Sequence, residues 1–476
     1  MKRNKVLLVN PWIYDFAAYD FWIKPVGLLS IGCYLEKHGY ETYLIDCMDR
    51  FQHLIPTRKK SRYGTGKFIR TAVEKPVVLK HVPRKFCRYG MPIDTFIQAI
   101  TEAPNPDVIL ITSGMTYWYP GVQEAIRILN KQLPDIPIIL GGIYATLCHD
   151  HALQNSGADY VIKGPGEIAA LKLVDSLTGN KHDINNQCFE FPEPVYRYYK
   201  QLASVPIFTS IGCPYRCSFC ASHLLSGKFR QKNPEKVVAE IEYYYHKRKV
   251  RHFAFFDDAL LINADEHISV ILNAIIEKKI HVNFHTPNGI HAQQISKDLA
   301  NEMFKAKFKT IRLSYETSNL YRQQEMGFKI TDNSLANAID YLESAGFQRK
   351  ELDVYVIMGL PEQTFEEVVT SMIFVAGLGA KVRLTSFSPI PGTIDWQRSI
   401  ELYNMPVDID PLLTNNSIFP LSRNDFTYEM FQKLRSLSKV INYSLDHQVN
   451  FFNESELAKI VAKSLYTKFK LSPGGI

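Results

Sequence analysis

The sequence predicts an α/β protein with a doubly wound, Rossmann-like domain over residues 1–185, a partial (β/α)6 barrel over residues 200–395 and a helical region over residues 399–476. Two observations predict this fold class. Short apolar segments alternate with segments of helical periodicity in two separate series, and the last part of the chain shows helical periodicity alone. Apolar strands that alternate with helices are typical of parallel sheets covered on both faces.

The first series contains five apolar strands with helices between them. The expected strands are residues 5–10, 41–46, 107–112, 136–140 and 160–163. The expected helices are residues 25–38, 121–133, 145–154 and 167–177. A stretch over about residues 50–95 has no clear period, so we expect it to be an insertion into this doubly wound domain.

The second series contains six strands, each followed by a helix or a closing segment. The expected strands are residues 207–211, 252–256, 281–285, 310–314, 353–358 and 382–387. The expected helices are residues 234–249, 265–279, 295–304, 331–345 and 365–378. Six β/α units in a row predict an open or partial barrel. Beyond it, residues 427–445 and 455–470 carry apolar residues at helical spacing and predict a cap.

The charge of the chain is modest and unevenly placed. The formal net charge is +7, and residues 58–88 contain eleven Lys or Arg and one Glu. We interpret this stretch as a solvated insertion, with a patch for nucleic acid or an anionic ligand as the alternative. No apolar run approaches the ~20 residues of a membrane span, and no targeting signal is visible. We therefore expect a cytoplasmic protein that does not bind nucleic acid.

Three of the eight cysteines are clustered as C-x3-C-x2-C, at Cys213, Cys217 and Cys220. Thiolates are soft ligands that suit zinc or an iron–sulfur cluster. Zinc stays open as an alternative, with His223 as a fourth ligand. Three ligands on a four-iron cluster leave one iron open for a substrate. The triplet also follows the first strand of the second series, where barrel enzymes keep their active sites.

The triplet, with the aromatic Phe219 directly before its third cysteine, resembles the radical S-adenosylmethionine superfamily. The resemblance implies that Cys213, Cys217 and Cys220 bind a [4Fe–4S] cluster whose open iron chelates the methionine part of S-adenosylmethionine. One-electron reduction would then yield methionine and a 5′-deoxyadenosyl radical that abstracts hydrogen. The electron would come from a donor such as flavodoxin or ferredoxin.

Polar and small residues at later strand ends extend this resemblance. The resemblance implies that they contact S-adenosylmethionine, as does Phe219; they are Asp257, Asp258, Ser314, Glu316, Ile357 and Gly359. The alternative for Glu316 is a helix cap or an ion pair with Arg322. The adenine motif G-x-I-x-G-x-x-E departs from its pattern here, because Tyr355 stands where its first glycine is expected.

Small residues also follow the strands of the first domain, and glycine lets a backbone approach a bulky ligand closely. They are Ser113, Gly114, Thr116, Gly141, Gly142 and Gly164. With residues 140–146 and 158–167, this region resembles the cobalamin-binding domain that precedes many radical enzymes, which implies cobalamin as a third cofactor. The D-x-H-x-x-G motif for a histidine on cobalt is absent. We interpret the aromatic run at residues 117–119 as packing, although these rings could face the corrin or the substrate.

The leading hypothesis is a radical S-adenosylmethionine enzyme that uses cobalamin to methylate an unactivated carbon. One alternative is the same radical chemistry directed to a rearrangement or ring reaction. A second is a non-catalytic protein that binds zinc or nucleic acid. No residue is assigned a catalytic role, and the sequence carries no code for the substrate, a small molecule or a peptide.

Overall fold

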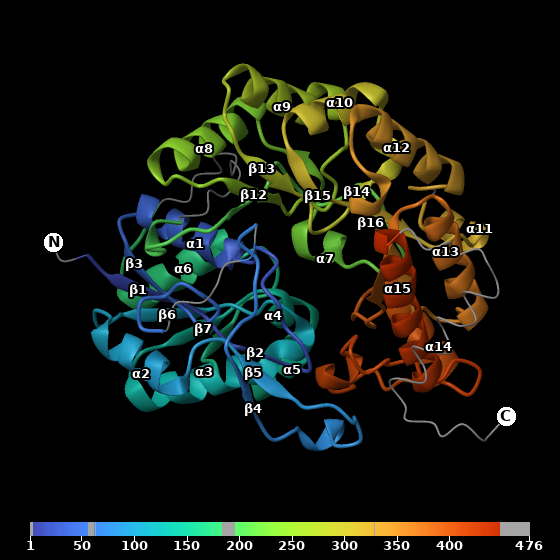
Figure 1. Ribbon diagram of the computed structural model, residues 1–476. Coiled ribbons are helices and arrows are strands. Elements are labelled where there is room, and N and C mark those ends of the chain that lie inside the picture. The colour runs from blue at the N-terminus through green and yellow to red at the C-terminus, as the bar shows by residue number, and fades with distance from the viewer. Residues whose placement is uncertain (1–2, 56–60, 62, 183–195, 328, 448–476) are drawn as a thin grey trace.

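The computed structural model describes residues 3–55, 61, 63–182, 196–327 and 329–447. Within these ranges the chain forms two parallel sheets and a C-terminal helical region (Figure 1). Cys188 and the helix predicted over residues 455–470 lie outside the described residues.

The N-terminal sheet has five parallel strands in the order β3-β1-β6-β7-β8, which confirms the doubly wound prediction. The strands are β1 (Lys5–Asn10), β3 (Glu41–Asp46), β6 (Val108–Ile111), β7 (Ile138–Leu140) and β8 (Tyr160–Val161). The helices are α1 (Val26–Lys37), α2 (Ile93–Glu102), α3 (Tyr119–Gln132), α4 (Ile143–Leu147), α5 (His149–Asn155) and α6 (Glu167–Thr178). Alternate β1 residues point to opposite faces: Val6 and Leu8 pack with α1 and α6, and Leu7 and Val9 pack with α2 and α3.

The insertion is not a plain loop. It contributes β4 (Arg70–Ala72), the short helix η1 (Val77–Leu79) and β5 (Cys87–Tyr89), and these strands join β2 (Ile13–Asp15) in an antiparallel sheet ordered β2-β5-β4. We call this sheet the arm. The sequence did not predict it because its strands are three residues long and every residue of β4 is exposed.

The second sheet carries six parallel strands in the order β17-β16-β15-β13-β12-β9, with the short β14 also paired to β15. The strands are β9 (Val205–Ile207), β12 (His252–Phe255), β13 (Asn283–His285), β14 (Ile290–His291), β15 (Phe308–Glu316), β16 (Leu352–Met358) and β17 (Lys381–Ser386). Its outer edges, β9 and β17, do not pair with each other. The sheet is therefore the partial barrel that the sequence predicts.

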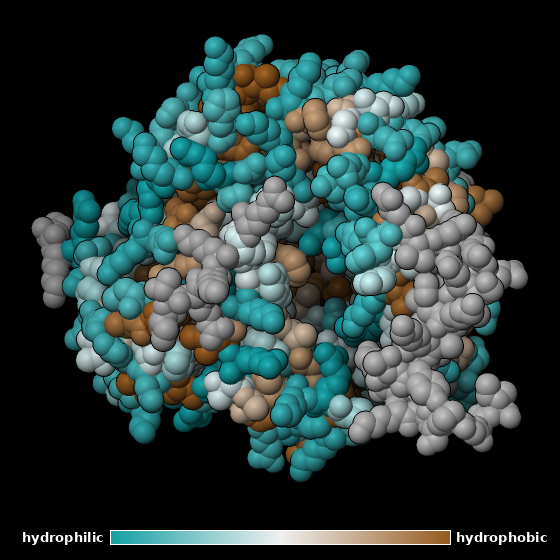
Figure 2. Space-filling model, viewed as in Figure 1, coloured by the Kyte–Doolittle hydropathy of each residue, from teal (hydrophilic) through white to brown (hydrophobic). Residues whose placement is uncertain are grey.

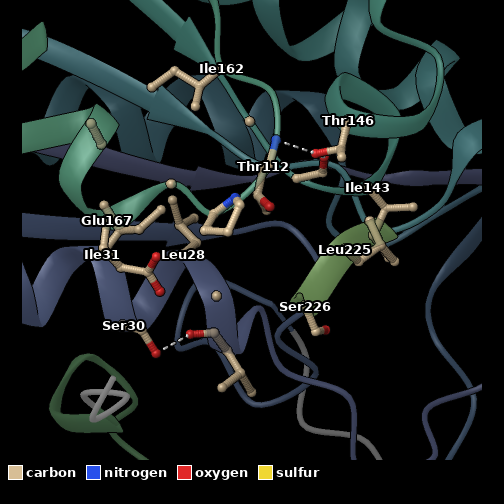
Figure 3. A pocket seen from close by; sticks show the side chains of 18 of the residues that line it. Leu28, Ser30, Ile31, Thr112, Ile143, Thr146, Ile162, Glu167, Leu225 and Ser226 are labelled. Carbon is tan, nitrogen blue, oxygen red and sulfur yellow. Dashed lines mark hydrogen bonds between the residues drawn. The ribbon is translucent and has the colours of Figure 1, made fainter. Parts of the chain in front are cut away.

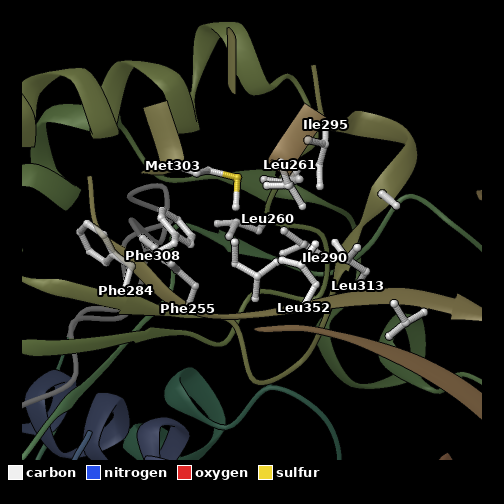
Figure 4. Packing of buried hydrophobic residues seen from close by; sticks show 14 of the residues in the cluster. Phe255, Leu260, Leu261, Phe284, Ile290, Ile295, Met303, Phe308, Leu313 and Leu352 are labelled. Carbon is white, nitrogen blue, oxygen red and sulfur yellow. The ribbon is translucent and has the colours of Figure 1, made fainter. Parts of the chain in front are cut away.

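Helices cover the outside of this sheet (Figure 1). They are α8 (Pro234–Lys247), α9 (Ile268–Glu277), α10 (Lys297–Lys305), α11 (Leu320–Glu325), α12 (Asp332–Ala345) and α13 (Phe365–Gly377). A large apolar core lies between them and the strands, with the rings of Phe255, Phe284 and Phe308 stacked beside Met303 (Figure 4). The predicted cap at Asn233 is present, since its side chain accepts a hydrogen bond from the N–H of Glu235.

The C-terminal region contains α14 (Ile394–Tyr403), the short helix η7 (Pro411–Thr414) and α15 (Tyr428–His447). Asn442 of α15 pairs with both backbone groups of Val382 at 2.8 Å, so it covers the edge strand β17. On the other side, the side chain of Asn415 donates to Asp15 of the arm at 3.0 Å. The region is therefore a bridge between the barrel and the N-terminal domain as well as a cap.

The three parts of the chain surround a central opening, and the space-filling view shows the surface hollowed there (Figures 1 and 2). The element α7 (Ser222–Ser226) lies beside this opening in Figure 1. None of the helices within the described ranges is long and apolar enough to cross a membrane.

Candidate functional site

The three cysteines lie in a loop that leaves the barrel sheet, and Asp257 fixes the point at which it leaves. One carboxylate oxygen of Asp257, Oδ1, accepts four hydrogen bonds of 2.5–2.9 Å from the backbone N–H groups and hydroxyls of Thr209 and Ser210. The predicted strand over residues 207–211 has the wrong bounds, because β9 covers Val205–Ile207. The next residues form β10 (Ser210–Ile211), which pairs with β11 (Arg230–Gln231) in a separate small sheet. Gly212, with φ +78°, opens the loop of residues 212–221, which we call the cluster loop.

The cluster loop is held at Ser218, between its second and third cysteines, and at Ser222, directly after the loop. The hydroxyl of Ser218 donates to Asp395 at 2.7 Å, and the N–H of Asp395 donates to the carbonyl of Ser218 at 3.0 Å. The hydroxyl of Ser222 donates to Asp258. Asp257 and Asp258, predicted to contact the cofactor, thus hold the loop in place. Asp257 is also buried, which raises its pKa to about 6, and its Oδ2 has no partner within the part of the chain that the structure describes.

The thiols lie close enough that Cys217 raises the pKa of both Cys213 and Cys220. Burial raises the pKa of Cys213 to about 11, and the neighbouring thiols of Cys217 and Cys220 add to that increase. Burial also raises the pKa of Cys217 and of Cys220, and Lys329 opposes it in both. The N–H of Ser222 donates to Cys220 Sγ at 3.5 Å.

The donor set has the composition of an iron–sulfur site. Among the described residues no group of three or more His, Cys, Asp or Glu side chains, His223 included, converges as a single metal ion requires. Ligands of a four-iron cluster bind separate irons, so their sulfurs need not converge on one point. Apolar side chains surround the thiol of Cys217, among them Ile357, Phe219 and Leu360. They keep water away from the site where a cluster would sit.

A buried ion pair lies beside the cluster loop. Lys329 Nζ is 3.2 Å from Glu316 Oε1 and 5.5 Å from the centre of the Phe219 ring. Burial opposes the charge of Lys329, but Glu316 and the nearby thiols outweigh it and raise the pKa of the ammonium group. Glu316 has φ +75°, a costly conformation for a residue with a side chain. The alternative pair of Glu316 with Arg322 is wrong, because Arg322 pairs with Glu367 at 2.8 Å.

His291 and Ser314 complete this end of the barrel. β14 pairs with β15 so that the two residues lie opposite each other. The ring of His291 meets Tyr215 of the cluster loop edge-on at 4.8 Å. Burial, aided by Lys329, lowers the pKa of His291 to about 3, so the ring is neutral, and its buried Nδ1 has no partner among the residues described. Neither His291 nor Lys329 was predicted, since each stands outside any recognisable sequence motif.

Gly359 is required by a turn and by packing. It has φ +91°, and a Cβ there would lie 2.7 Å from the ring of Phe419. The side chain of Gln363 closes the turn: its oxygen accepts from the N–H of Gly359 at 2.7 Å, and its nitrogen donates to the carbonyl of Ile357 at 3.1 Å. Tyr355, which replaces the expected glycine, donates its hydroxyl to the carbonyl of Pro287 at 2.7 Å.

A pocket of about 320 Å³ lies at the strand ends of the N-terminal sheet, and we call it the strand-end pocket (Figure 3). Three of the predicted glycines line it, Gly141, Gly142 and Gly164. At Gly141 and Gly164 a Cβ would meet no heavy atom within 4 Å, so the backbone borders open space. Its walls are mostly apolar, and its volume is within the range of small-molecule sites.

The barrel half of the chain closes this pocket. Leu225 and Ser226 of α7 line it (Figure 3). Arg230 of β11 and Lys232, which follows β11, line it as well. Because α7 begins two residues after Cys220, the cluster loop and the strand-end pocket are joined by one short segment.

The other three residues predicted in the N-terminal domain do not line the pocket. Ser113 is buried, donates to the carbonyl of Gly141 at 2.9 Å and accepts from the N–H of Tyr144 at 3.1 Å, so it ties two strand ends together. Gly114 is exposed and lies against Trp118. Thr116 is buried, and its hydroxyl has no partner in the described ranges.

Comparison with known families identifies both halves of this arrangement. Residues 207–375 match the radical SAM superfamily, and residues 85–174 match the B12 binding domain. These two domains imply a [4Fe–4S] cluster and S-adenosylmethionine for the barrel and cobalamin for the N-terminal sheet. The residues present fit these groups: three clustered thiols for the cluster, and a glycine-bordered pocket for part of a bulky ligand.

Individual relatives are distant. An uncharacterized methyltransferase of Pyrococcus horikoshii is 24% identical over 336 residues, which cover 64% of this chain and 72% of that protein. The anaerobic magnesium-protoporphyrin IX monomethyl ester cyclase of Synechocystis is 27% identical over 272 residues, 51% of this chain and 46% of the cyclase. The radical S-adenosylmethionine methyltransferase TsrM of Kitasatospora setae, solved with cobalamin and a [4Fe–4S] cluster, superposes with a TM-score of 0.61 at 16% identity, over 84% of this chain and 75% of TsrM. The last similarity shows a shared fold.

Proposed function

We propose that this chain, which combines a radical SAM domain with a B12-binding domain, cleaves S-adenosylmethionine reductively and methylates an unactivated carbon. The observation that carries the proposal is the short path between the two sites. α7 begins two residues after the third cysteine and lines the strand-end pocket of the other domain. The methyltransferase relatives support the choice of methyl transfer.

The cofactors would supply an electron at the open iron of the cluster and a methyl carrier at the strand-end pocket. The chain's own residues would position and shield the reacting groups. Cys213, Cys217 and Cys220 would hold the cluster, and Asp257 and Asp395 fix their loop from outside. The apolar side chains around Cys217 would exclude water, which otherwise competes for reactive intermediates.

Glu316 and Lys329 are placed to bind S-adenosylmethionine. Their buried ion pair lies beside Cys217 and Phe219, where the methionine end of the substrate would have to reach the cluster. A carboxylate suits ribose hydroxyls and an ammonium group suits the methionine carboxylate. The unpartnered Nδ1 of His291 is a further polar group available there. Their removal is expected to raise the KM for S-adenosylmethionine.

The electron would come from a small redox protein such as flavodoxin or ferredoxin, and we expect the reaction to take place in the cytoplasm. Pro214 and Arg216 of the cluster loop are exposed, so a donor could approach the cluster from this side. The substrate, a small molecule or a peptide, would enter at the central opening.

The test is anaerobic reconstitution of the cluster, followed by addition of reductant and S-adenosylmethionine. We expect 5′-deoxyadenosine from the wild type and none from Cys217→Ala. An intact cluster that yields no 5′-deoxyadenosine would refute the radical chemistry. Titration with hydroxocobalamin tests the other half, and the absence of tight binding would refute the role of cobalamin.

A second candidate, radical chemistry without methyl transfer, is supported by the likeness to the cyclase of Synechocystis. The by-products separate the two candidates. Methyl transfer leaves S-adenosylhomocysteine beside 5′-deoxyadenosine, whereas a rearrangement or ring closure leaves 5′-deoxyadenosine alone. Mass spectrometry of both products in one turnover distinguishes them.

A further inference from the structure

The basic insertion forms one wall of a cavity that the proposed mechanism does not use. The cavity measures about 350 Å³ and lies on one face of the arm. In the arm's register Arg70 lies opposite Tyr89, and Ala72 lies opposite Cys87, so these four side chains share a face. The remaining lining residues are Phe16, Arg84 and Lys85. We call this space the arm cavity.

The arm cavity has an excess of positive charge. Of its three cations, none forms an ion pair with a carboxylate anywhere in the described part of the chain. Arg84 lies over the ring of Phe16 at 5.2 Å and donates one hydrogen bond to the carbonyl of Ser417 at 3.1 Å. Arg70 and Lys85 line the cavity and are exposed to solvent. A guanidinium group carries five N–H donors, so Arg84 retains donors for another partner.

The surroundings add positive charge and little compensation. Arg435 of α15 is close enough to Arg84 that burial and this repulsion together lower the pKa of Arg435. Two carboxyl groups lie near the cavity. The exposed Glu74 lines an adjoining hollow with Arg84 and Lys85 and forms no ion pair within the described residues. Asp15 is buried, which raises its pKa. Its oxygens already accept hydrogen bonds from Trp118 at 2.8 Å and Asn415 at 3.0 Å. A concave site with several cations and a masked carboxyl group favours an anion.

The position of the arm cavity connects it to the proposed site. Asp15, on the cavity side of the arm, holds the indole of Trp118, and Trp118 packs against Gly114 directly after β6. On the other side, Asn415 and Ser417 belong to the C-terminal bridge that borders the central opening (Figure 1). Residues beside the arm cavity therefore contact both the N-terminal domain, through Trp118, and the C-terminal bridge, through Ser417.

We propose that Arg70, Arg84 and Lys85 bind an oxyanion group, a phosphate or a carboxylate, on the substrate of this enzyme. The identity of this anion as part of the substrate rests on the proposed function. The binding of an anion in the arm cavity is independent of the proposed function. The cavity is larger than a single phosphate group, so part of the organic body of the substrate would enter with it.

The test is calorimetric titration of the full reconstituted chain with inorganic pyrophosphate and, separately, with citrate at low salt. We expect saturable binding of one of the two probes. Binding of pyrophosphate indicates a phosphate group on the substrate, and binding of citrate indicates a carboxylate. Charge-assisted hydrogen bonds suggest that Arg70→Gln and Lys85→Gln each weaken this binding about tenfold. Both residues are exposed, so these variants should fold. Lys80→Gln removes an exposed charge of the same insertion outside the cavity and should leave binding unchanged.

Failure of this proposal is distinct from failure of the proposed function. No saturable binding of either probe, or equal binding by Arg70→Gln, Lys85→Gln and the wild type, overturns the anion site even if 5′-deoxyadenosine forms. If Lys80→Gln weakens probe binding as much as Lys85→Gln does, and an RNA oligonucleotide binds more tightly than either probe, the anion site is overturned in favour of an extended basic surface. Cys217→Ala should lose 5′-deoxyadenosine formation and retain probe binding.

Discussion

The cluster loop and the strand-end pocket are shaped by opposite means. Polar contacts fix the cluster loop: four hydrogen bonds converge on one oxygen of Asp257, and Asp395 holds Ser218. Open space defines the strand-end pocket, where Gly141 and Gly164 border a mostly apolar volume. A loop that carries a metal cluster needs thiols in fixed positions, whereas a pocket for a bulky ligand needs room near the backbone. Loss of polar contacts should therefore disrupt the cluster loop, whereas added side-chain volume should disrupt the strand-end pocket.

The largest effect is expected from the cluster loop itself. Cys217→Ala removes one of three cluster ligands and should abolish both bound iron and 5′-deoxyadenosine formation. Cys148→Ala is the matched control, since Cys148 is a mostly buried thiol of the N-terminal domain. Iron and sulfide analysis of both variants checks the result, and retention of a full cluster by Cys217→Ala would contradict the ligand assignment.

Asp257→Ala should destabilise the barrel strongly. It leaves four buried donors of Thr209 and Ser210 without their acceptor, and unsatisfied buried donors cost about 1–3 kcal/mol each. We expect a loss of at least about 3 kcal/mol in the free energy of unfolding. Urea denaturation measures it, with the exposed Asp265→Ala as the control. A loss as small as that of Asp265→Ala would show that the loop does not depend on Asp257.

The raised pKa of Asp257 predicts a pH dependence of stability. The folded chain holds this proton more tightly than the unfolded chain, with a pKa of about 6 against 3.8. The resulting stabilisation is complete below about pH 4 and is lost as the pH rises through about 6. Relative to Asp257→Asn, the wild type should lose about 3 kcal/mol of unfolding free energy between pH 3 and pH 7. Parallel pH curves for the two proteins would exclude this titration.

A larger side chain in the strand-end pocket should weaken cobalamin binding. Gly141 has an ordinary backbone conformation and open space at its Cβ, so Gly141→Leu projects a side chain into the pocket without strain. Cobalamin binding should weaken about tenfold or more, because about 1.4 kcal/mol of contact is displaced. Thermal stability should change little, and Gly141→Ala should have a smaller effect. Equal cobalamin affinity in Gly141→Leu and the wild type would place the ligand elsewhere.

Ser218→Ala should have the smallest effect. It removes one hydrogen bond to Asp395, worth about 1 kcal/mol, while the backbone contact between the two residues remains. We expect slower or less complete cluster reconstitution with unchanged cobalamin affinity. A loss of cobalamin affinity instead would mean that the two sites are not shaped independently.

The sequence could predict features that depend on local patterns, but not features that depend on how distant segments meet in the fold. The cysteine spacing, the strand alternation and the glycines at strand ends are local patterns, and the structure places Gly141, Gly142 and Gly164 at one pocket as expected. Lys329 and His291 come to the site through the course of the loop after α11 and the pairing of β14 with β15, which no local pattern encodes. Asp257 was predicted from its position at a strand end, but its contacts with Thr209 and Ser210 were not, because these partners are 47 and 48 residues away. The arm was missed because its strands are too short to show a period.

The cluster and the cobalamin are proposed to serve one reaction at neighbouring sites. α7 has five residues and spans about 7.5 Å, so the two cofactors should lie well within about 20 Å of each other. Pulsed electron paramagnetic resonance on the reconstituted chain, with both the cluster and the cobalamin reduced to paramagnetic forms, measures this distance. We expect a strong dipolar coupling that is lost in Cys217→Ala. Full occupancy of both cofactors without a measurable coupling would contradict it.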